Sequence, residues 1–326
     1  MKKHLSSLLF LMATMLWGFA FTAQKELGAI PFFTVGSIRN FLAGAFLFCS
    51  IPLMDRILKN GRTFITRKRI DFTRAELIGG VICGTVLALA STLQQIGLSG
   101  DTDAGKGAFI SALYVLFVPI ISLFLGQKSA PNVWAGVGIA ILGFYLLCIK
   151  SDFTVVPSDM MLLLCSVVFA LHIIVIGKFS PGCDGVRLSC IQFFTAFVII
   201  TPLALIINGM PDMELVMKNI LPLLYYGVCS GGLGYTLQII GQGLEGTDPA
   251  VASCILSLES VFGMLGGMIF LGEVMTPKEY LGCAVVFCAV IISQLDMDYV
   301  KAKIKSLRAK KDKNKDFDNN SLQNKT

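Results

Sequence analysis

Charged side chains are scarce in this sequence, at 15% of its 326 residues, whereas 55% of the residues are apolar. A soluble domain carries about 25% charged residues, because its surface is solvated. The composition therefore excludes a soluble domain and predicts an integral membrane protein.

Histidine is nearly absent, with two in the chain, and neither HExxH nor GxSxG occurs, so a zinc protease or a serine hydrolase lacks its parts. Residues 100–106 match GxxxxGK, but Gly107 stands where a phosphate loop needs a hydroxyl side chain for magnesium. Asp101 and Asp103 begin like a calcium loop, but Ala112 replaces its bidentate acid. The ten cysteines show no paired motif. We predict no metal, no cofactor and no enzymatic activity.

Long apolar runs dominate what is present. They are about 20 residues long, the length that a helix needs to cross the hydrocarbon core of a bilayer. We predict an all-α integral membrane fold with ten transmembrane helices, at residues 5–24, 31–54, 77–98, 104–125, 130–149, 159–178, 186–207, 220–241, 248–271 and 277–296. An even number of spans places both termini on one side of the membrane.

Positive charge is concentrated on that side. Of the 27 Lys and Arg residues, 21 fall on the side of the termini and five on the other, and Arg39 lies inside a span. The bias predicts cytoplasmic termini and a multi-pass protein of the plasma membrane. The basic segment 55–74 and the tail after residue 300 would be attracted to anionic lipid, and nucleic acid is not implied. The tail is either a short interfacial helix or a solvated segment.

An internal repeat relates the two halves of the chain. An offset of 146 residues superposes Gly100 on Gly246, Ser111 on Ser257, Leu125-Gly126 on Leu271-Gly272, Pro131 on Pro277, Trp134 on Tyr280 and Gly136 on Gly282. An offset of 147 pairs the GxxxG runs at 80–84 and 227–231. We divide the chain into repeats 1–150 and 151–296 and a polar, basic cytoplasmic tail, 297–326. Because each repeat has five helices, the second is inverted, an arrangement used by secondary transporters.

Several motifs in these repeats resemble the drug/metabolite transporter superfamily, and specifically its EamA-type members. They are Trp17-Gly18, Ile38-Arg39, AGKGAFISALYVLFVPI at 104–120, and LESVF followed by LGE within 258–273. The resemblance spans roughly residues 5–296. It implies a ten-helix inverted-repeat fold without a cofactor that moves amino acids, related metabolites or drugs, commonly outward.

Glu259 is the sharpest candidate for a functional side chain. A carboxyl group at membrane depth is costly, so it is by default a functional hypothesis. Its repeat counterpart is Leu113, so the carboxyl is not part of the duplicated framework. Burial favours the neutral form of a carboxyl group. Glu259 is therefore predicted to carry a proton or bind a substrate ammonium, or else to be a neutral group bonded to a neighbouring helix.

Three other ionisable residues have two interpretations each. Arg39 stays charged and must find an anion, a carbonyl or water, with a structural ion pair favoured over a coupling role. Lys106, at the outer mouth, either meets a substrate carboxylate or extends to solvent. His172, the histidine within a span, either titrates in the coupling reaction or is a satisfied hydrogen-bonding group.

Uncharged polar and aromatic residues complete the predicted lining of a cavity for a small amphipathic solute. With Lys106 and Glu259, the predicted substrate-binding set contains Trp17, Gln94, Gln95, Tyr114, Tyr235, Gln238 and Ser257. Pro119 is expected to kink its helix.

The prediction is a secondary transporter of small metabolites, amino acids or related amphipathic solutes, which exports them by alternating access around a midplane cavity. Its partners are a small-molecule substrate and the bilayer, with proton coupling as one hypothesis and no oligomeric state implied. The alternative is a membrane enzyme or lipid-handling protein without a recognised motif.

Overall fold

The computed structural model describes residues 2–57, 72–100, 102, 104–148, 156–244, 247–272, 274 and 276–295. Within these residues the chain is helical, with loops and turns between the helices and no strand. The predicted tail, 297–326, lies outside the described residues.

Ten helical segments traverse the molecule, as predicted. Seven of them are single helices, namely α1 (Lys2–Glu26), α2 (Phe32–Ile57), α3 (Arg74–Ser99), α6 (Pro131–Cys148), α7 (Pro157–Phe179), α8 (Gly185–Asn208) and α14 (Pro277–Gln294). The other three are composite, namely α4 (Ala104–Ala112) with α5 (Tyr114–Phe124), α10 (Ile220–Leu224) with η2 (Tyr225–Tyr235) and α11 (Thr236–Gly243), and α12 (Pro249–Leu256) with α13 (Glu259–Phe270). Two short helices, η1 (Leu27–Ala29) and α9 (Met213–Lys218), lie in connections.

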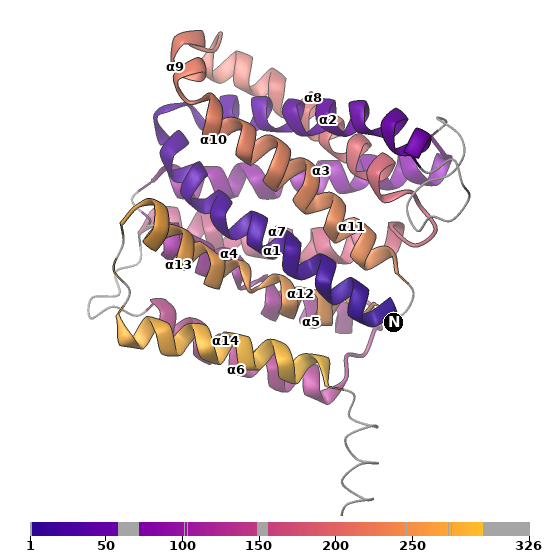
Figure 1. Cartoon of the computed structure of the whole chain (residues 1–326), viewed down its shortest axis with the longest axis vertical. Coiled ribbons are helices and arrows are strands. Elements are labelled where there is room, and N and C mark those ends of the chain that lie inside the picture. Colours follow the sequence, from indigo (N-terminus) through magenta and orange to yellow (C-terminus); the bar gives the residue numbers. More distant parts are fainter. Residues whose placement is uncertain are drawn as a thin grey trace, which may run out of the picture.

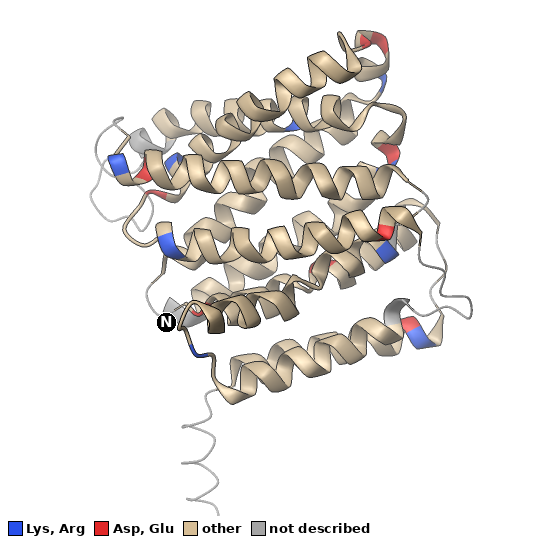
Figure 2. Ribbon diagram, turned by 180° about the vertical axis from the view of Figure 1, so that it is seen from behind, with Lys and Arg blue, Asp and Glu red and all other residues tan. Residues whose placement is uncertain are grey.

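Nine segments of the described chain are long and apolar enough to cross a membrane, and α6 supplies a shorter apolar helix, Pro131–Leu146. Figure 1 shows the start of α1 and the end of α14 on the same side of the bundle. Figure 2 shows that charged residues lie almost entirely at the two ends of the helices. The ten-helix membrane fold predicted from the apolar runs is therefore confirmed.

The packing of the helices follows the two-fold relation between the halves. α2 packs along its counterpart α8, and α6 packs along its counterpart α14. α3 packs against α7 and α8, while its counterpart, which contains η2, packs against α1 and α2. α1 likewise packs against α12 and α13, and α7 against α4 and α5. Each of these contacts in one half has its equivalent in the other, as an inverted repeat requires.

Small residues allow the closest helix approaches. A Cβ atom on Gly84 of α3 would lie 2.4 Å from the carbonyl oxygen of Gln192 in α8, and one on Gly227 of η2 would lie 2.7 Å from Cβ of Leu42 in α2. These glycines belong to the two GxxxG runs, so both runs form the same kind of helix interface.

Matching turns end α5 and α13. Gly126 and Gly272 have φ angles of +80° and +67°, a left-handed conformation that other residues adopt only with strain. The helices that follow begin at Pro131 and Pro277, where a proline costs no hydrogen bond. The glycine and proline matches of the repeat are thus explained by backbone geometry.

Three predicted continuous helices are instead interrupted. At Leu113, between α4 and α5, the amide donates to the carbonyl of Ile110, three residues back, and at Leu258 the amide donates likewise to Ile255. Such tightened turns in mid-span often mark functional hinges. The interruption at Leu113 precedes Pro119, which lies inside α5, so the expected break falls earlier than predicted. The third composite span winds as a π-helix over Tyr225–Tyr235.

Candidate functional site

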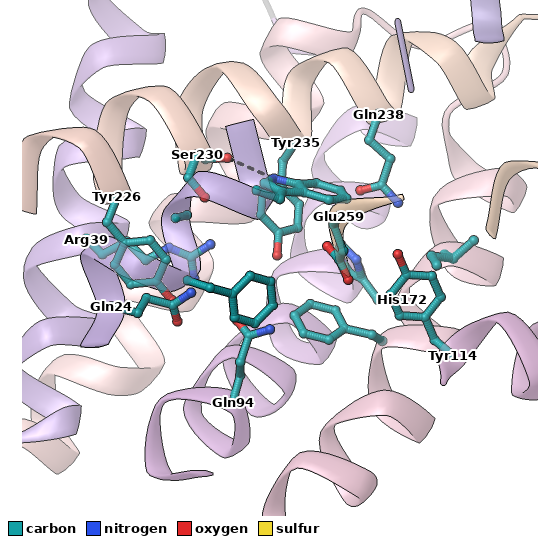
Figure 3. A pocket seen from close by; sticks show the side chains of 15 residues that line it. Gln24, Arg39, Gln94, Tyr114, His172, Tyr226, Ser230, Tyr235, Gln238 and Glu259 are labelled. Carbon is teal, nitrogen blue, oxygen red and sulfur yellow. Dashed lines mark hydrogen bonds between the residues drawn. The ribbon is translucent and has the colours of Figure 1, made fainter. Parts of the chain in front are cut away.

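A small cavity lies among the helices near these irregular segments (Figure 3). Its volume is about 30 Å³, which accommodates one or two water molecules, at roughly 10–15 Å³ each by the same measure. The lining comes from α1, α2, α3, α5, α7, η2, α11 and α13, and comprises Trp17, Ala20, Phe21, Gln24, Arg39, Gln94, Tyr114, Phe169, His172, Ile173, Tyr226, Ser230, Tyr235, Gln238 and Glu259. Both repeats therefore contribute to one cavity.

The π-helix η2 presents three polar residues, Tyr226, Ser230 and Tyr235, to this cavity. In an α-helix, at about 100° per residue, Tyr226 and Tyr235 would lie on opposite faces. A π-helix closes its hydrogen bonds over five residues and has more residues per turn, so positions four and five apart share a face. The winding also leaves the Ser230 carbonyl to accept a hydrogen bond from Nε1 of Trp17 at 3.1 Å.

Glu259 is the first residue of α13, directly after the tightened turn at Leu258. Its side chain is buried and adjoins Tyr114, which is the first residue of α5 after the other tightened turn. The Tyr114 hydroxyl forms no hydrogen bond of good geometry with any of the described residues. The two interruptions thus bring together a carboxyl group and a phenol hydroxyl at the cavity wall (Figure 3). Glu259 lies in the middle of the span Pro249–Phe270, and the span is interrupted there.

Arg39 lies at another part of the same cavity, against aromatic rings. Its guanidinium carbon is 4.3 Å from the ring centroid of Tyr226, 5.5 Å from that of Tyr235 and 5.9 Å from that of Phe193. Its Nε and Nη1 atoms have no hydrogen-bond partner, and no carboxylate of the described chain forms an ion pair with it. The structural ion pair favoured from the sequence is therefore wrong for the described residues, and cation–π contacts take its place.

His172 and Gln94 hold hydrogen-bonded positions at the cavity wall. His172 Nε2 lies 3.0 Å from Oε1 of Gln192, and the His172 ring centroid is 5.7 Å from that of Tyr235. Nε2 of Gln94 donates to the Ser111 hydroxyl at a long 3.5 Å. The interpretation of His172 as a satisfied hydrogen-bonding group agrees with this geometry.

Three residues predicted to bind substrate lie outside the cavity lining. Lys106 forms an ion pair with Asp159 of α7, at 2.6 Å between Nζ and Oδ2. Gln95 reaches Ser99 on its own helix, and the Ser257 hydroxyl donates to the Cys254 carbonyl at 2.8 Å. Their role in substrate binding stays a prediction, and none of them lines the cavity in this conformation. Gln95 and Ser257 have partners within their own spans, whereas Lys106 has its partner on another span.

Sequence reasoning omitted several residues of the lining, of which Gln24, Tyr226 and Ser230 are polar. The Tyr226 hydroxyl donates to Oε1 of Gln24 at 2.7 Å. Gln24 carried the same signal as Gln94, a polar side chain at the end of an apolar span, and could have been found. Tyr226 and Ser230 could not, because α-helical spacing does not place them beside Tyr235.

The arrangement suits recognition of a small solute, with charged and polar groups set into aromatic walls. Tyr235 is central to these walls, with ring centroids 4.7 Å from Trp17 and 5.6 Å from Phe193. Among the described residues, no group of three or more His, Cys, Asp or Glu side chains could hold a metal ion.

The sequence and the fold of this chain are similar to those of known proteins. The profile of the EamA-like transporter family matches residues 4–149 and 156–294. The chain is 29% identical over 286 residues to an uncharacterized transporter of Archaeoglobus fulgidus, covering 87% of this chain and 84% of the relative. It is 23% identical over 288 residues to an uncharacterized transporter of Clostridium kluyveri, covering 83% and 85% of the two chains. A solved crystal structure superposes with a TM-score of 0.69 at 15% identity, over 89% of this chain and 95% of that one.

Proposed function

Because the chain belongs to the EamA-like transporter family, we propose that it is a secondary transporter that moves small amphipathic metabolites, amino acids or related solutes, out of the cell by alternating access. The observation that carries the proposal is the position of Glu259. It is a buried carboxyl group at a helix break, in a cavity lined by both repeats.

The helix interruptions support a site that changes shape. Tyr114 and Glu259 each begin the second part of a broken span, so a change at either turn alters the cavity directly. A cavity that holds only a few water molecules is too small for an amino acid with a large side chain. We propose that the described conformation is an occluded one, and that a solute enters when the two repeats rock apart.

The roles of individual residues are part of this proposal. Trp17, Tyr114 and Tyr235 form aromatic walls, and Gln94 and Gln238 supply uncharged donors and acceptors. Glu259 binds a substrate ammonium or carries a proton, since an intramembrane carboxyl group that faces a cavity is a common coupling group.

Orientation follows from the charge bias of the sequence. With 21 of 27 basic residues on the side of the termini, we propose that both termini are cytoplasmic and that the protein resides in the plasma membrane. A reporter that fluoresces only in the cytoplasm, fused after residue 326, should be active, and one that works only outside the cell should be inactive.

The test of transport has two stages. A screen of metabolite release and uptake in cells that lack or overproduce the protein identifies candidate solutes. Purified protein in liposomes is then loaded with each labelled solute, and its loss is followed. Loss of chemically unaltered solute, absent from protein-free liposomes, supports transport.

The membrane-enzyme alternative makes the opposite prediction for the same experiment. If the labelled compound is recovered in a chemically changed form, with the change dependent on the protein, the transporter proposal is refuted. A lipid-handling protein would alter the distribution of labelled lipid between leaflets and leave soluble compounds in place.

A further inference from the structure

Arg39 combines deep burial with unsatisfied hydrogen-bonding groups. Its side chain is 2% exposed, and its Nε and Nη1 atoms have no hydrogen-bond partner within the described residues. It nevertheless borders the cavity (Figure 3). The unsatisfied donors therefore belong to a side chain that borders the cavity.

A guanidinium group in this position requires an acceptor. Arginine keeps its positive charge in proteins, and burial of an unpaired charge is costly. The rings of Tyr226, Tyr235 and Phe193 offset part of that cost through cation–π contacts. A ring face, however, does not replace a hydrogen-bond acceptor for the N–H groups, which point outward in the plane of the guanidinium. An anion with two oxygen atoms matches that plane.

Glu259 gives the cavity a second ionisable residue, whose charge when ionised is opposite to that of Arg39. The Arg39 guanidinium carbon is 5.5 Å from the ring centroid of Tyr235, and Figure 3 shows Tyr235 between Arg39 and Glu259 in the view. Figure 3 shows Arg39 towards the left end of the lining and Glu259 nearer its middle. Arg39 and Glu259 are the only Lys, Arg, Asp or Glu residues among those that line the cavity. The lining therefore becomes dipolar when Glu259 is ionised.

Lys106 is not positioned to bind an anionic group of a solute in the cavity. Its ammonium is paired with Asp159, and it does not line the cavity. Lys106, which the sequence suggested as a partner for a substrate carboxylate, is thus paired with Asp159. Arg39, for which the sequence favoured a structural ion pair, lines the cavity instead.

We infer that Arg39 is the receptor for a carboxylate of the transported solute, and that the solute is zwitterionic and binds with its ammonium towards Glu259. This inference rests on the proposed transport function and adds the substrate class and its orientation. Trp17 and Tyr235, whose rings are in contact and line the same cavity, would hold the apolar part of the solute.

The test uses matched solutes that differ by one charged group. Liposomes with purified protein are assayed with labelled leucine and phenylalanine, with the amines that lack the carboxylate (isopentylamine and phenethylamine), and with the acids that lack the ammonium (4-methylpentanoate and 3-phenylpropanoate). Wild-type protein should transport at least one amino acid about 100-fold faster than its amine at equal low concentration, because an unpaired buried charge is left behind.

Arg39→Gln should lower transport of that amino acid about 100-fold and should not lower transport of the amine, since no unpaired charge remains when the amine binds. Glu259→Gln should show the reverse preference, with the acid analogue affected least. Arg39→Lys retains the charge without the planar fork and should give an intermediate loss. If Arg39→Gln does not insert into the membrane, the Arg39→Lys variant is assayed in its place.

Three results would overturn the inference. One is an unchanged ratio of amino acid to amine transport in both Arg39 variants. Another is transport that depends on chloride and is lost when chloride is replaced by gluconate, which would make Arg39 a chloride site. The last is transport confined to solutes without a carboxylate, which would leave the transporter proposal standing. If wild-type protein moves no solute at all, the proposed function itself fails.

Discussion

The Nζ atom of Lys106 donates a hydrogen bond to Oδ2 of Asp159 at 2.6 Å, which joins the first turn of α4 to the first turn of α7. The same carboxylate accepts hydrogen bonds from the Thr102 hydroxyl at 2.8 Å and from the Val156 amide at 3.0 Å. Nearby, Lys25 of α1 donates to the carbonyl oxygens of Leu98, Gly100 and Thr102. Charged groups therefore connect four spans, α1, α3, α4 and α7, at the end of the bundle opposite the termini.

Removal of the Lys106 charge should weaken this tie without altering solute preference. The Lys106 side chain is 19% exposed, so we expect Lys106→Met to lower the free energy of unfolding by about 1 kcal/mol. Thermal unfolding in detergent measures the loss, and Lys218→Met, at an exposed position on α9, is the control that should show no change. A shift in the relative transport of different solutes in Lys106→Met would contradict the position of Lys106 outside the cavity.

Glu259→Gln should abolish the dependence of transport on a pH gradient if Glu259 carries the proton. Gln keeps the size and hydrogen-bonding ability of the side chain but cannot ionise. Transport is compared in liposomes with and without an imposed gradient. Glu279→Gln is a matched control, because Glu279 is buried but closes the capping box of α14, a role that Gln also fulfils. Equal gradient dependence in wild type and Glu259→Gln would rule out the coupling role.

Gly84→Ala should destabilise the interface of α3 with α8. The added Cβ would lie 2.4 Å from the Gln192 carbonyl oxygen and 2.6 Å from Cβ of Thr195, so the helices must separate, at a cost of about 1–3 kcal/mol. Gly138→Ala in α6, where a Cβ meets nothing within 4 Å, should be neutral or slightly stabilising. Equal thermal stability of the two variants would show that the close approach is not required.

Trp17 should report solute binding by fluorescence. The chain has two tryptophans, and Trp17 lines the cavity whereas Trp134 is on α6 and partly exposed. In Trp134→Phe, titration with a transported solute should change the emission of Trp17 and saturate with solute concentration. In Trp17→Phe, the emission of Trp134 should not respond. A response carried by Trp134 instead would place the binding site elsewhere.

Much of the fold could be predicted because it depends on local chemistry. An apolar run of about 20 residues must satisfy its backbone hydrogen bonds internally, and a helix is the way for a single segment to do so in lipid. Gly126 and Gly272, followed by Pro131 and Pro277, predict turns from backbone geometry alone. Repetition of these signals at one offset then predicts two related halves.

The site could be predicted only in part. Trp17, Tyr114, Tyr235 and Glu259 were found because aromatic and ionisable groups inside a span are unusual, whatever their partners. The pairing of Lys106 with Asp159 could not be predicted, because Asp159 is 53 residues away and on another span. A sequence indicates which side chains are costly to bury but not which of them meet.

The amino-acid sequence therefore determined the number of spans, their turns and the duplicated framework, since these follow from interactions between residues close together in the chain. The tertiary structure decided the partners of the charged residues and the winding of η2, which turns Tyr226, Ser230 and Tyr235 to one face. It also placed Arg39 among aromatic rings from other helices. These features depend on the rotation and spacing of whole helices, which are set by packing between segments far apart in the sequence.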